Sequence, residues 1–225
     1  MKQILVYSDS LSWGIIPNTR ERLPFNKRWP GVFESFLRYN TCKVRIIENC
    51  LNGRRTAWDD PFKRGRNATS DLAQAIEMHS PLELVIIMLG TNDFQNSHNN
   101  NAWLSAQGTN KLISIIKEAP VEPGMNIPQI LVVSPPEILS PKGVISNKFA
   151  GAEIRSKGLA QELQRITLEN NVFFFDVNSV TKASEIDGIH LDEKQHKVIG
   201  NELGAYVFEK TLVSQHEPTK RIKVN

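Results

Sequence analysis

The 225-residue chain has only two cysteines, Cys42 and Cys50, and neither belongs to a C-x-x-C pair. So few cysteines exclude a disulfide framework, and the missing pair excludes a zinc knuckle or a dithiol redox site. The apolar stretch at the N-terminus ends at Ser8, too early for the hydrophobic core of a signal peptide. The longest aliphatic run, residues 84–89, is far too short to span a membrane. We therefore expect a cytoplasmic protein that has no membrane partner and keeps its thiols reduced.

The sequence also lacks the common motifs of nucleotide-binding and metal enzymes. It contains no G-x-G-x-x-G and no Gly-Lys pair, which excludes a dinucleotide fingerprint and a P-loop. H-E-x-x-H is absent, and the five histidines show no spacing typical of metal ligands. The G-x-S-x-G elbow of the ordinary α/β-hydrolases is missing as well, which leaves other kinds of serine hydrolase open. We expect no metal and no cofactor.

Neither the composition nor the net charge is extreme. The chain is 40% hydrophobic and 23% charged, as is usual for a folded protein, so a disordered or fibrous protein is excluded. The net charge of +3 is too small to indicate a nucleic-acid partner. The length suits one α/β domain. We predict a single domain over residues 1–213, followed by a polar tail, residues 214–225, that frays.

Five short runs of aliphatic and β-branched residues are typical of buried strands, because they show no polar alternation. These runs cover residues 3–7, 44–48, 84–89, 129–134 and 172–176. Amphipathic segments between and after them predict helices. The helices cover residues 29–39, 70–79, 104–117, 154–168 and 193–210. The alternation predicts an α/β fold, a three-layer α/β/α arrangement in which helices cover both faces of a five-stranded parallel sheet.

Polar residues that suit acyl-transfer chemistry follow several of these strands. In an open parallel sheet the ligand site lies at the carboxyl ends of the strands. Ser10 follows the first strand, and Asn92 follows the third. Asp187 and His190 precede the last helix at a spacing that lets the carboxylate hydrogen-bond the imidazole. A serine nucleophile needs such a base with its orienting acid, and the developing anion needs donors such as an asparagine amide.

Three segments resemble the first, third and fifth sequence blocks of the SGNH (GDSL-type) serine hydrolases. They are Y-S-D-S-L-S-W-G at residues 7–14, G-T-N-D at 90–93 and D-G-I-H at 187–190. The resemblance runs from residue 4 to about residue 203 and is closest to the bacterial arylesterase/acyltransferase branch. R-W-P-G-V at 28–32 and L-V-V-S-P-P at 131–136 are similar to that branch too. The resemblance implies a flavodoxin-like SGNH-hydrolase fold and an esterase with a serine nucleophile.

The resemblance also implies a role for each site residue. Ser10 is the expected nucleophile, His190 the base and Asp187 its orienting partner. The expected oxyanion hole consists of the Asn92 amide and the backbone N–H groups of Ser10 and Gly53. Gly53 is expected there because it is the small residue of the second block whose backbone can approach the anion closely.

Two residues, Ser8 and Cys50, stand where the family usually has glycine. Ser8 is a minor change if the backbone there needs no positive φ, whereas it tightens or misplaces the turn if a positive φ is needed. A misplaced turn would reduce activity. A catalytically inactive binding module is therefore retained as an alternative of a different class.

Apolar residues near the motifs suggest a small acyl pocket, which favours short-chain esters as the small-molecule substrate. The expected lining residues are Trp13, Phe94, Ile138, Phe149 and Ile189. Relatives in the resembling branch transfer acyl groups to alcohols in a site closed by packed subunits. The resemblance therefore implies acyl transfer beside hydrolysis, and a homo-oligomer. Carbohydrate O-deacetylase and lysophospholipase remain alternatives within the same fold.

The remaining histidines and a basic loop receive structural interpretations. His79, His98, His196 and His216 are expected to have no catalytic role. The loop over residues 53–67 contains a cluster of basic side chains: Arg54, Arg55, Lys63, Arg64 and Arg66. We expect a solvated loop or a subunit contact, and the alternative is a loop that steers an anionic substrate to the site.

Overall fold

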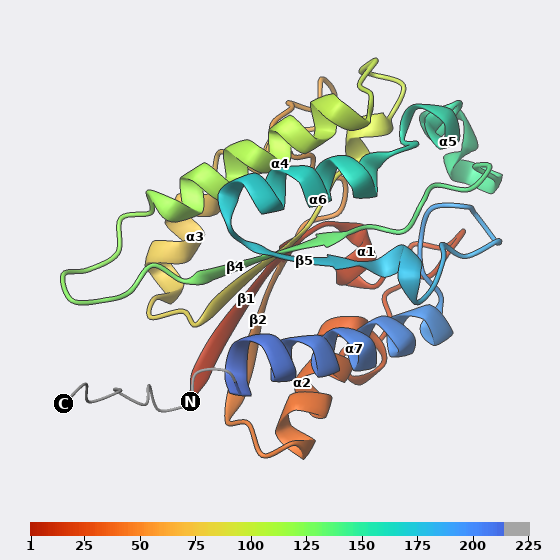
Figure 1. Ribbon diagram of the computed structural model, residues 1–225. Helices are drawn as coiled ribbons and strands as arrows, with labels where there is room; N and C mark the ends of the chain where they lie inside the picture. Colours follow the sequence, from red (N-terminus) through yellow and green to blue (C-terminus); the bar gives the residue numbers. More distant parts are fainter. Residues whose placement is uncertain (214–225) are drawn as a thin grey trace, which may run out of the picture.

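A computed structural model describes residues 1–213 and contains one parallel sheet (Figure 1). Its strands are β1 (Lys2–Ser8), β2 (Val44–Cys50), β3 (Leu84–Met88), β4 (Gln129–Ser134) and β5 (Phe173–Asp176). The order across the sheet is β2-β1-β3-β4-β5, and every neighbouring pair is parallel. The predicted α/β class with a five-stranded parallel sheet is confirmed.

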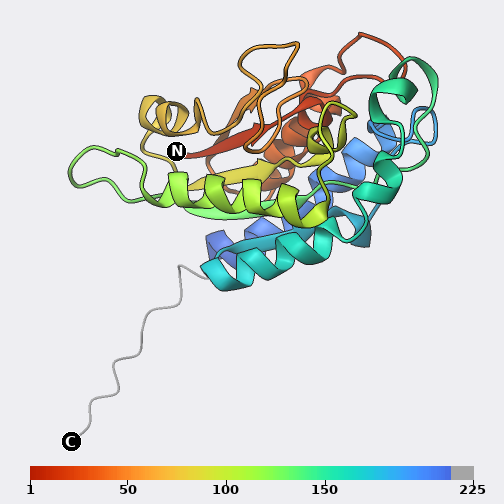
Figure 2. The same cartoon turned by 90° about the horizontal axis from the view of Figure 1, so that it is seen from above.

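Helices cover both faces of the sheet (Figure 1; Figure 2). On one face α2 (Trp29–Tyr39) and α7 (Glu193–Val207) lie side by side. On the other face lie α3 (Leu72–His79), α4 (Ala102–Lys117) and α6 (Leu159–Asn170). The shorter elements are α1 (Ser10–Trp13), α5 (Ala152–Arg155), η1 (Phe25–Lys27), η2 (Thr91–Phe94), η3 (Gly143–Phe149), η4 (Val177–Ser179) and the π-helical η5 (Phe208–Val213).

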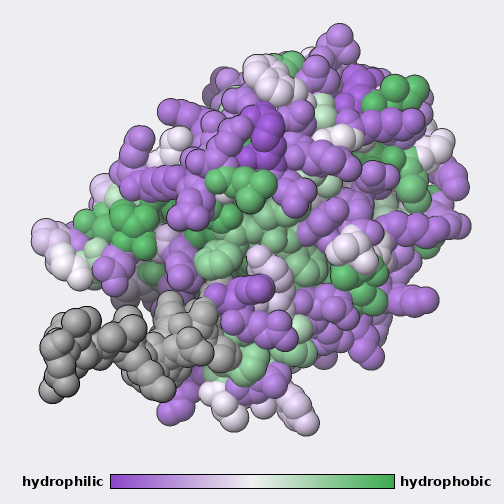
Figure 3. All heavy atoms as spheres, viewed as in Figure 1, coloured by the Kyte–Doolittle hydropathy of each residue, from purple (hydrophilic) through white to green (hydrophobic). Residues whose placement is uncertain are grey.

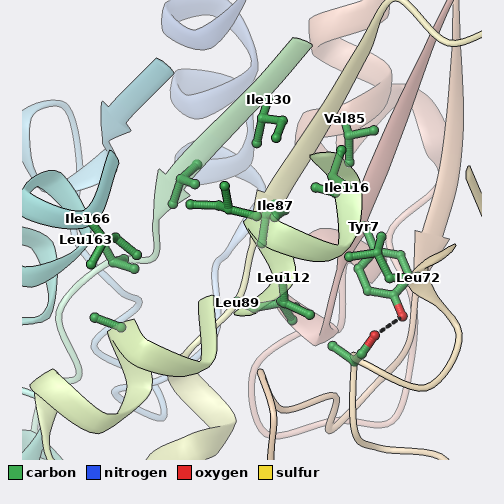
Figure 4. Packing of buried hydrophobic residues seen from close by; sticks show 14 of the residues in the cluster. Tyr7, Leu72, Val85, Ile87, Leu89, Leu112, Ile116, Ile130, Leu163 and Ile166 are labelled. Atoms are coloured by element: carbon green, nitrogen blue, oxygen red, sulfur yellow. Dashed lines mark hydrogen bonds between the residues drawn. The ribbon is translucent and has the colours of Figure 1, made fainter. Parts of the chain in front are cut away.

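The two helical layers enclose two apolar cores, one on each face of the sheet. Leu5 and Tyr7 of β1 belong to the core under α3, α4 and α6, whereas Ile4 and Val6 belong to the core under α2 and α7. All four residues are fully buried. Figure 4 shows the first core, where the Tyr7 hydroxyl donates to the Ala68 carbonyl at 2.8 Å. Burial on both faces explains why the strand sequences show no polar alternation.

The helices α2 and α7 approach each other closely because α7 places glycines against α2. A Cβ on Gly200 would lie 2.5 Å from the Cβ of Val32, and a Cβ on Gly204 would lie 2.6 Å from the ring of Phe36. Both distances are too short for carbon atoms that are not bonded, so these positions require glycine. The close packing fixes α7, and the segment before it, relative to α2.

One predicted helix is divided in the structure. The pattern predicts a single helix over residues 154–168, but α5 ends at Arg155 and α6 begins at Leu159. Gly158 between them has φ = +86°, a left-handed conformation that a continuous right-handed helix does not contain. The last predicted helix changes to π-helical turns after Val207. Neither difference alters the layers.

Two long connecting segments, residues 14–28 and 135–151, contain local structure. An antiparallel bridge joins Ile15 to Arg22, and η3 lies within the loop over residues 135–149. Among the helices of residues 1–213, none has the length and apolar character that crossing a lipid bilayer requires. The proposed domain limits stay a prediction, and the expected tail, residues 214–225, lies outside the described residues.

Candidate active site

The carboxyl ends of the strands meet at the right of Figure 1, where the predicted site residues begin. Ser10 follows β1 as the first residue of α1. Asp9 caps this helix, because its Oδ1 accepts the N–H of Leu11 at 2.9 Å. The cap turns the chain sharply from strand to helix. Ser10 is therefore held at the sheet edge, with 7% of its surface exposed.

Asp187 and His190 form a hydrogen-bonded pair between η4 and α7. His190 Nδ1 lies 2.7 Å from Asp187 Oδ2. Asp187 Oδ1 accepts the backbone N–H groups of Ile189 at 3.0 Å and of His190 at 2.9 Å. Burial alone would raise the pKa of Asp187, but the hydrogen bond and charge of His190 and the two N–H donors outweigh burial and lower this pKa. An ionised Asp187 fixes the proton on Nδ1 and leaves Nε2 as the basic nitrogen.

The turn between the two residues depends on a glycine. Gly188 has φ = +77°, and a Cβ there would lie 2.5 Å from the carbonyl oxygen of Ser140. Two hydrogen bonds attach the turn to the loop over residues 135–149: the N–H of Leu139 donates to the Gly188 carbonyl at 2.9 Å, and the N–H of Lys142 donates to the Asp187 carbonyl at 3.0 Å. The proline-containing loop therefore positions the Asp187–His190 pair.

The side chain of Asn92, in η2 after β3, is held at both ends. Its Nδ2 donates to Asp9 Oδ2 at 2.8 Å, and its Oδ1 accepts from Gln95 Nε2 at 2.6 Å. Because Asp9 directly precedes Ser10, the amide is tied to the strand end that carries the predicted nucleophile. The second hydrogen of Nδ2 remains for another acceptor. Asp9 and Gln95 are not among the predicted site residues, although a carboxylate directly before a helix is a recognisable N-cap signal.

Gly53 lies in the turn after β2 with φ = +83°. The N–H of Arg54 closes this turn by donating to the Leu51 carbonyl at 2.9 Å. A Cβ on Gly53 would meet only the Nε of Arg66, at 3.9 Å, so the backbone conformation rather than space requires glycine. Within residues 1–213 neither the N–H of Gly53 nor that of Ser10 donates a hydrogen bond. Both groups are therefore able to serve as donors.

Asp93 joins the Gly53 loop to the segment that carries Asn92. Its buried carboxylate accepts the Thr56 N–H at 2.9 Å, the Thr56 hydroxyl at 2.7 Å and the Ser105 hydroxyl at 2.7 Å. Burial raises the pKa of Asp93, and these hydrogen bonds oppose the rise. Asp93 thus fixes the spacing between two of the predicted oxyanion donors.

Asp9 is a fully buried carboxylic acid whose pKa is raised to about 6. Burial is the largest cause, and a backbone N–H, the charge of His190 and the Asn92 amide oppose it. The segment that carries His190 leads into α7, which begins at the right of Figure 1, where α1 with Ser10 also lies. The structure therefore gathers Ser10, Asn92 and the Asp187–His190 pair at one edge of the sheet, while their catalytic roles stay predictions.

A family model for the GDSL-like lipase/acylhydrolase family matches residues 9–198. The chain belongs to this family. The resemblance found in the three sequence blocks is confirmed, and the prediction of a carboxylic ester hydrolase is confirmed at the level of the family.

Solved structures of esterases share the fold. The inhibitor-bound aryl esterase of M. smegmatis is 32% identical, with a TM-score of 0.87 over 93% of this chain and 99% of that chain. Est24, a carbohydrate acetylesterase from Sinorhizobium meliloti, is 31% identical, with a TM-score of 0.85 over 93% of this chain and 99% of that chain. No curated protein sequence matches at a significant level. The predicted SGNH-hydrolase fold is confirmed.

Ser8, which replaces a glycine usual among GDSL-type hydrolases, causes no strain in this member. It is the last residue of β1, and its φ is not positive. Its hydroxyl donates to the Met88 carbonyl at 2.6 Å and accepts from the Ser12 hydroxyl at 2.6 Å, and the Ser12 hydroxyl accepts from Trp29 Nε1 at 3.0 Å. Cys50 is likewise a strand residue without positive φ. Both replacements are therefore compatible with the GDSL-type backbone.

The residues predicted to line the acyl pocket lie deeper than expected. Phe94, Ile138, Phe149 and Ile189 are at most 6% exposed and belong to the core under α3, α4 and α6, whereas Trp13 is half-buried. The crevice that Phe94 and Ile138 line holds about 10 Å³. That volume accommodates about one water molecule and no acyl chain. These four residues contribute to the core, and their role in lining an acyl pocket stays a prediction.

The basic loop is not solvated throughout, contrary to the expectation. Arg54 and Arg55 are at most 4% exposed. Arg54 lies over the ring of Tyr7 at 4.0 Å and donates to the Ser8 carbonyl at 2.9 Å. The three basic residues that follow are exposed or partly exposed. The turn at Gly53 directs the two arginines inward, which the charge pattern alone does not reveal.

His196 connects α7 to α2. It is fully buried, and its Nδ1 accepts the N–H of Trp29, the first residue of α2, at 3.2 Å. Its pKa is lowered to about 3, mainly by burial and further by the charges of Arg28 and His190. A neutral His196 is therefore part of the α2–α7 interface.

The other histidines take no part in the site that the structure shows. His79 ends α3, and Nε2 of His98 lies 2.8 Å from the Asp59 carbonyl. His216 lies outside the described residues. Within residues 1–213 no group of three or more His, Cys, Asp or Glu side chains is arranged to hold a metal ion.

Proposed function

We propose that the chain is a serine esterase that hydrolyses short-chain carboxylic esters through an acyl-enzyme on Ser10. The observation that carries the proposal is the Asp187–His190 pair, with 2.7 Å between Oδ2 and Nδ1, at the sheet edge where Ser10 begins α1. The likeness to the aryl esterase of M. smegmatis, at 32% identity, supports an aryl ester as substrate, and the likeness to the carbohydrate acetylesterase Est24 supports a small acyl group.

Acylation starts with proton transfer. His190 Nε2 takes the proton of Ser10 Oγ while Oγ bonds to the carbonyl carbon of the ester. The electron pair of the carbonyl double bond moves onto oxygen, which gives a tetrahedral oxyanion. The imidazolium, stabilised by the Asp187 carboxylate, then donates its proton to the leaving alcohol as the ester bond breaks. Ser10 keeps the acyl group.

Deacylation follows the same path in reverse with another nucleophile. Water gives a proton to His190 and bonds to the acyl carbon, and the bond to Ser10 Oγ breaks as Oγ regains a proton from the imidazolium. The product is a carboxylic acid. If an alcohol replaces water, the product is a new ester, so acyl transfer to alcohols belongs to this proposal and needs no further residue.

Three donors face the oxyanion in this mechanism: the Asn92 amide and the backbone N–H groups of Ser10 and Gly53. Asp9 and Gln95 hold the amide from both ends, so it is oriented before the ester arrives. Preorganised donors stabilise the transition state without a cost of reorientation, and they usually supply a large share of the rate.

Carbohydrate O-deacetylation is the second candidate activity. The likeness to Est24 of Sinorhizobium meliloti, at 31% identity, favours it. Both activities use the same acyl-enzyme and a small acyl group, and they differ in the alcohol. Rates on acetylated xylan and on para-nitrophenyl acetate distinguish them. A series of para-nitrophenyl esters of increasing chain length tests the lysophospholipase alternative, which requires the rate to rise with acyl length.

The proposal includes a homo-oligomer. Val144 and Ile186 are 88% and 53% exposed, and Ile186 directly precedes Asp187. Asn18 connects the two segments, because its Nδ2 donates to the Ile186 carbonyl at 3.3 Å and its amide packs against Gly143, the residue before Val144. A second copy of the chain bound here would bury these side chains and supply walls for a restricted acyl site.

Covalent labelling tests the proposed nucleophile. A fluorophosphonate probe should add one label to the wild type, at Ser10 by peptide mapping, and none to Ser10→Ala, which should also lose hydrolysis of para-nitrophenyl acetate. Ser12→Ala is the matched control, because the Ser12 hydroxyl is occupied by Ser8 and Trp29. It should label like the wild type. A folded wild type that takes no label and hydrolyses no ester would support the binding-module alternative.

A further inference from the structure

A cleft of about 450 Å³ opens beside the proposed oxyanion hole. Its walls come from the loop after β2, the segment after η2 and the end of η3: Asp60, Phe62, Lys63, Gln95, Asn96, Ser97 and Lys148. Gln95 belongs to both places, because its Nε2 donates to Asn92 Oδ1 at 2.6 Å. A group bound in the cleft would therefore lie one side chain away from the proposed oxyanion donor.

Arg55 lies fully buried beneath the cleft. Its Nη2 donates to three residues of the wall: to Asp60 Oδ2 at 3.3 Å, to Gln95 Oε1 at 2.8 Å and to Ser97 Oγ at 2.7 Å. Its Nε and Nη1 have no hydrogen-bond partner in the part of the chain that the structure describes. A buried guanidinium with two unpartnered nitrogens retains unsatisfied hydrogen-bond donors.

The walls of the cleft add to this positive charge. Lys63 and Lys148 line the cleft, and neither forms a salt bridge within residues 1–213. Asp60 is the acidic residue of the walls, and it already binds Arg55 and accepts the N–H of Phe62 at 2.9 Å. The pKa of Lys148 is lowered, first by partial burial and then by neighbouring cations, among them Arg55 and Lys63, while Asp60 opposes the shift. The walls thus hold two lysines and one carboxylate, while the buried Arg55 beneath them interacts with Asp60 and also with the charge of Asp93.

We propose that this cleft is a specificity subsite for a carboxylate carried by the ester substrate. Lys63 and Lys148 would pair with the carboxylate, and the buried charge of Arg55 would strengthen the attraction. The proposal rests on the esterase function proposed above. It implies that the physiological ester is an anion, bound with its carboxylate between the lysines and its carbonyl oxygen at Asn92.

Two matched pairs of esters test the subsite. The para-nitrophenyl monoester of glutaric acid against para-nitrophenyl pentanoate places the charge on the acyl side. Para-acetoxybenzoate against its methyl ester places the charge on the alcohol side. In the wild type, kcat/KM for the charged member of one pair should fall as NaCl is added, since salt screens the attraction. For that pair, kcat/KM of the charged ester divided by kcat/KM of the neutral ester should fall about tenfold in Lys63→Met/Lys148→Met. The fall should come chiefly from a higher KM for the charged ester.

Matched variants separate a subsite from a general effect of charge. Lys111→Met/Lys157→Met removes the same charge outside the cleft and should leave the ratio unchanged, and Lys63→Arg/Lys148→Arg should retain it. If the ratio is the same in wild type and cleft variant for both pairs, the subsite is overturned, while Ser10-dependent hydrolysis of the neutral esters leaves the proposed function intact. If the folded wild type hydrolyses no member of either pair, the proposed function fails and the subsite fails with it.

Discussion

Asn92 depends on a chain of buried side chains that runs through the site. Asp9 holds its Nδ2 and Gln95 holds its Oδ1, while Gln95 is held in turn by Arg55. These bonds connect a buried guanidinium to the residue directly before Ser10. A donor that is fixed at both ends loses little freedom when an oxyanion forms, which is the condition for strong electrostatic stabilisation.

Replacing Asn92 tests this donor. Asn92→Ala should lower kcat for para-nitrophenyl acetate about 10²–10³-fold, because one oxyanion donor is lost. It should also lower the free energy of unfolding by about 1–3 kcal/mol, because Asp9 and Gln95 lose buried partners. Asn170→Ala is the control, since Asn170 bonds Asn110 at 2.8 Å in the α4–α6 layer, away from the site. If that variant loses as much activity, the loss reflects stability and not oxyanion binding.

At the residue scale, the sequence predicts the side chains of the proposed chemistry better than it predicts the buried side chains that hold them in place. The spacing of Asp187 and His190 suffices to predict their contact, which the structure shows at 2.7 Å. Gln95 and Arg55 meet across 40 residues of sequence, and no local pattern encodes such a contact. Hydrophobicity near a motif likewise does not distinguish a core residue from a pocket wall, so the lining of the acyl pocket stays a prediction.

At the scale of elements, the α2–α7 layer determines where the Asp187–His190 segment lies. Gly200 and Gly204 allow the two helices to touch, and the His196 side chain of α7 accepts a hydrogen bond from the first residue of α2. The segment that carries His190 leads directly into α7. The position of the proposed base therefore follows from helix packing on the face of the sheet that lies away from α4.

The buried histidine makes this layer sensitive to acid. The unfolded chain binds a proton at His196 below a pKa of about 6.5, whereas the folded chain does so only near a pKa of about 3. The unfolded state thus binds more protons between these values, and the free energy of unfolding falls as the pH falls through this window, by about 1.4 kcal/mol per unit. His196→Asn keeps an acceptor for the Trp29 N–H and cannot be protonated in this range.

Urea unfolding of wild type and His196→Asn at pH 7, 6 and 5 measures the effect. The difference between the two free energies of unfolding should shift in favour of the variant by about 1.4 kcal/mol for each unit below pH 6. A difference that stays constant with pH would show that His196 is not held neutral by the α2–α7 packing.

Strands and helices are predictable from the sequence where the hydrophobic pattern alone determines them. Apolar runs locate the strands because both faces of the sheet are buried, and the apolar stripe locates α2 over residues 29–39 as the structure has it. The predicted helix over residues 154–168 fails at Gly158, since the amphipathic pattern continues across a backbone position that is not helical. Local conformation, rather than hydrophobicity, decides that boundary.

At the scale of the whole molecule, exposed apolar residues at the rim of the site are the basis of the proposed homo-oligomer. Val144 and Ile186 are exposed apolar residues on segments that also hold the Asp187–His190 turn. Light scattering after size-exclusion chromatography should give a mass of at least two chains for the wild type. Val144→Ser/Ile186→Ser should lower that mass, whereas Met78→Ser/Leu168→Ser, which changes equally exposed residues on α3 and α6, should not. A monomeric wild type would remove the basis for the oligomer.

The pairing of α2 with α7 also has a consequence in time. Synthesis finishes α2 at residue 39 and reaches α7 at residue 193, so at about 5–20 residues per second the two helices are separated by roughly 8–30 s on the ribosome. During that interval the apolar stripe of Trp29, Phe33 and Leu37 has no partner helix. Ser10 precedes His190 by 180 residues in the sequence, so the nascent chain carries its proposed nucleophile well before the base that would activate it.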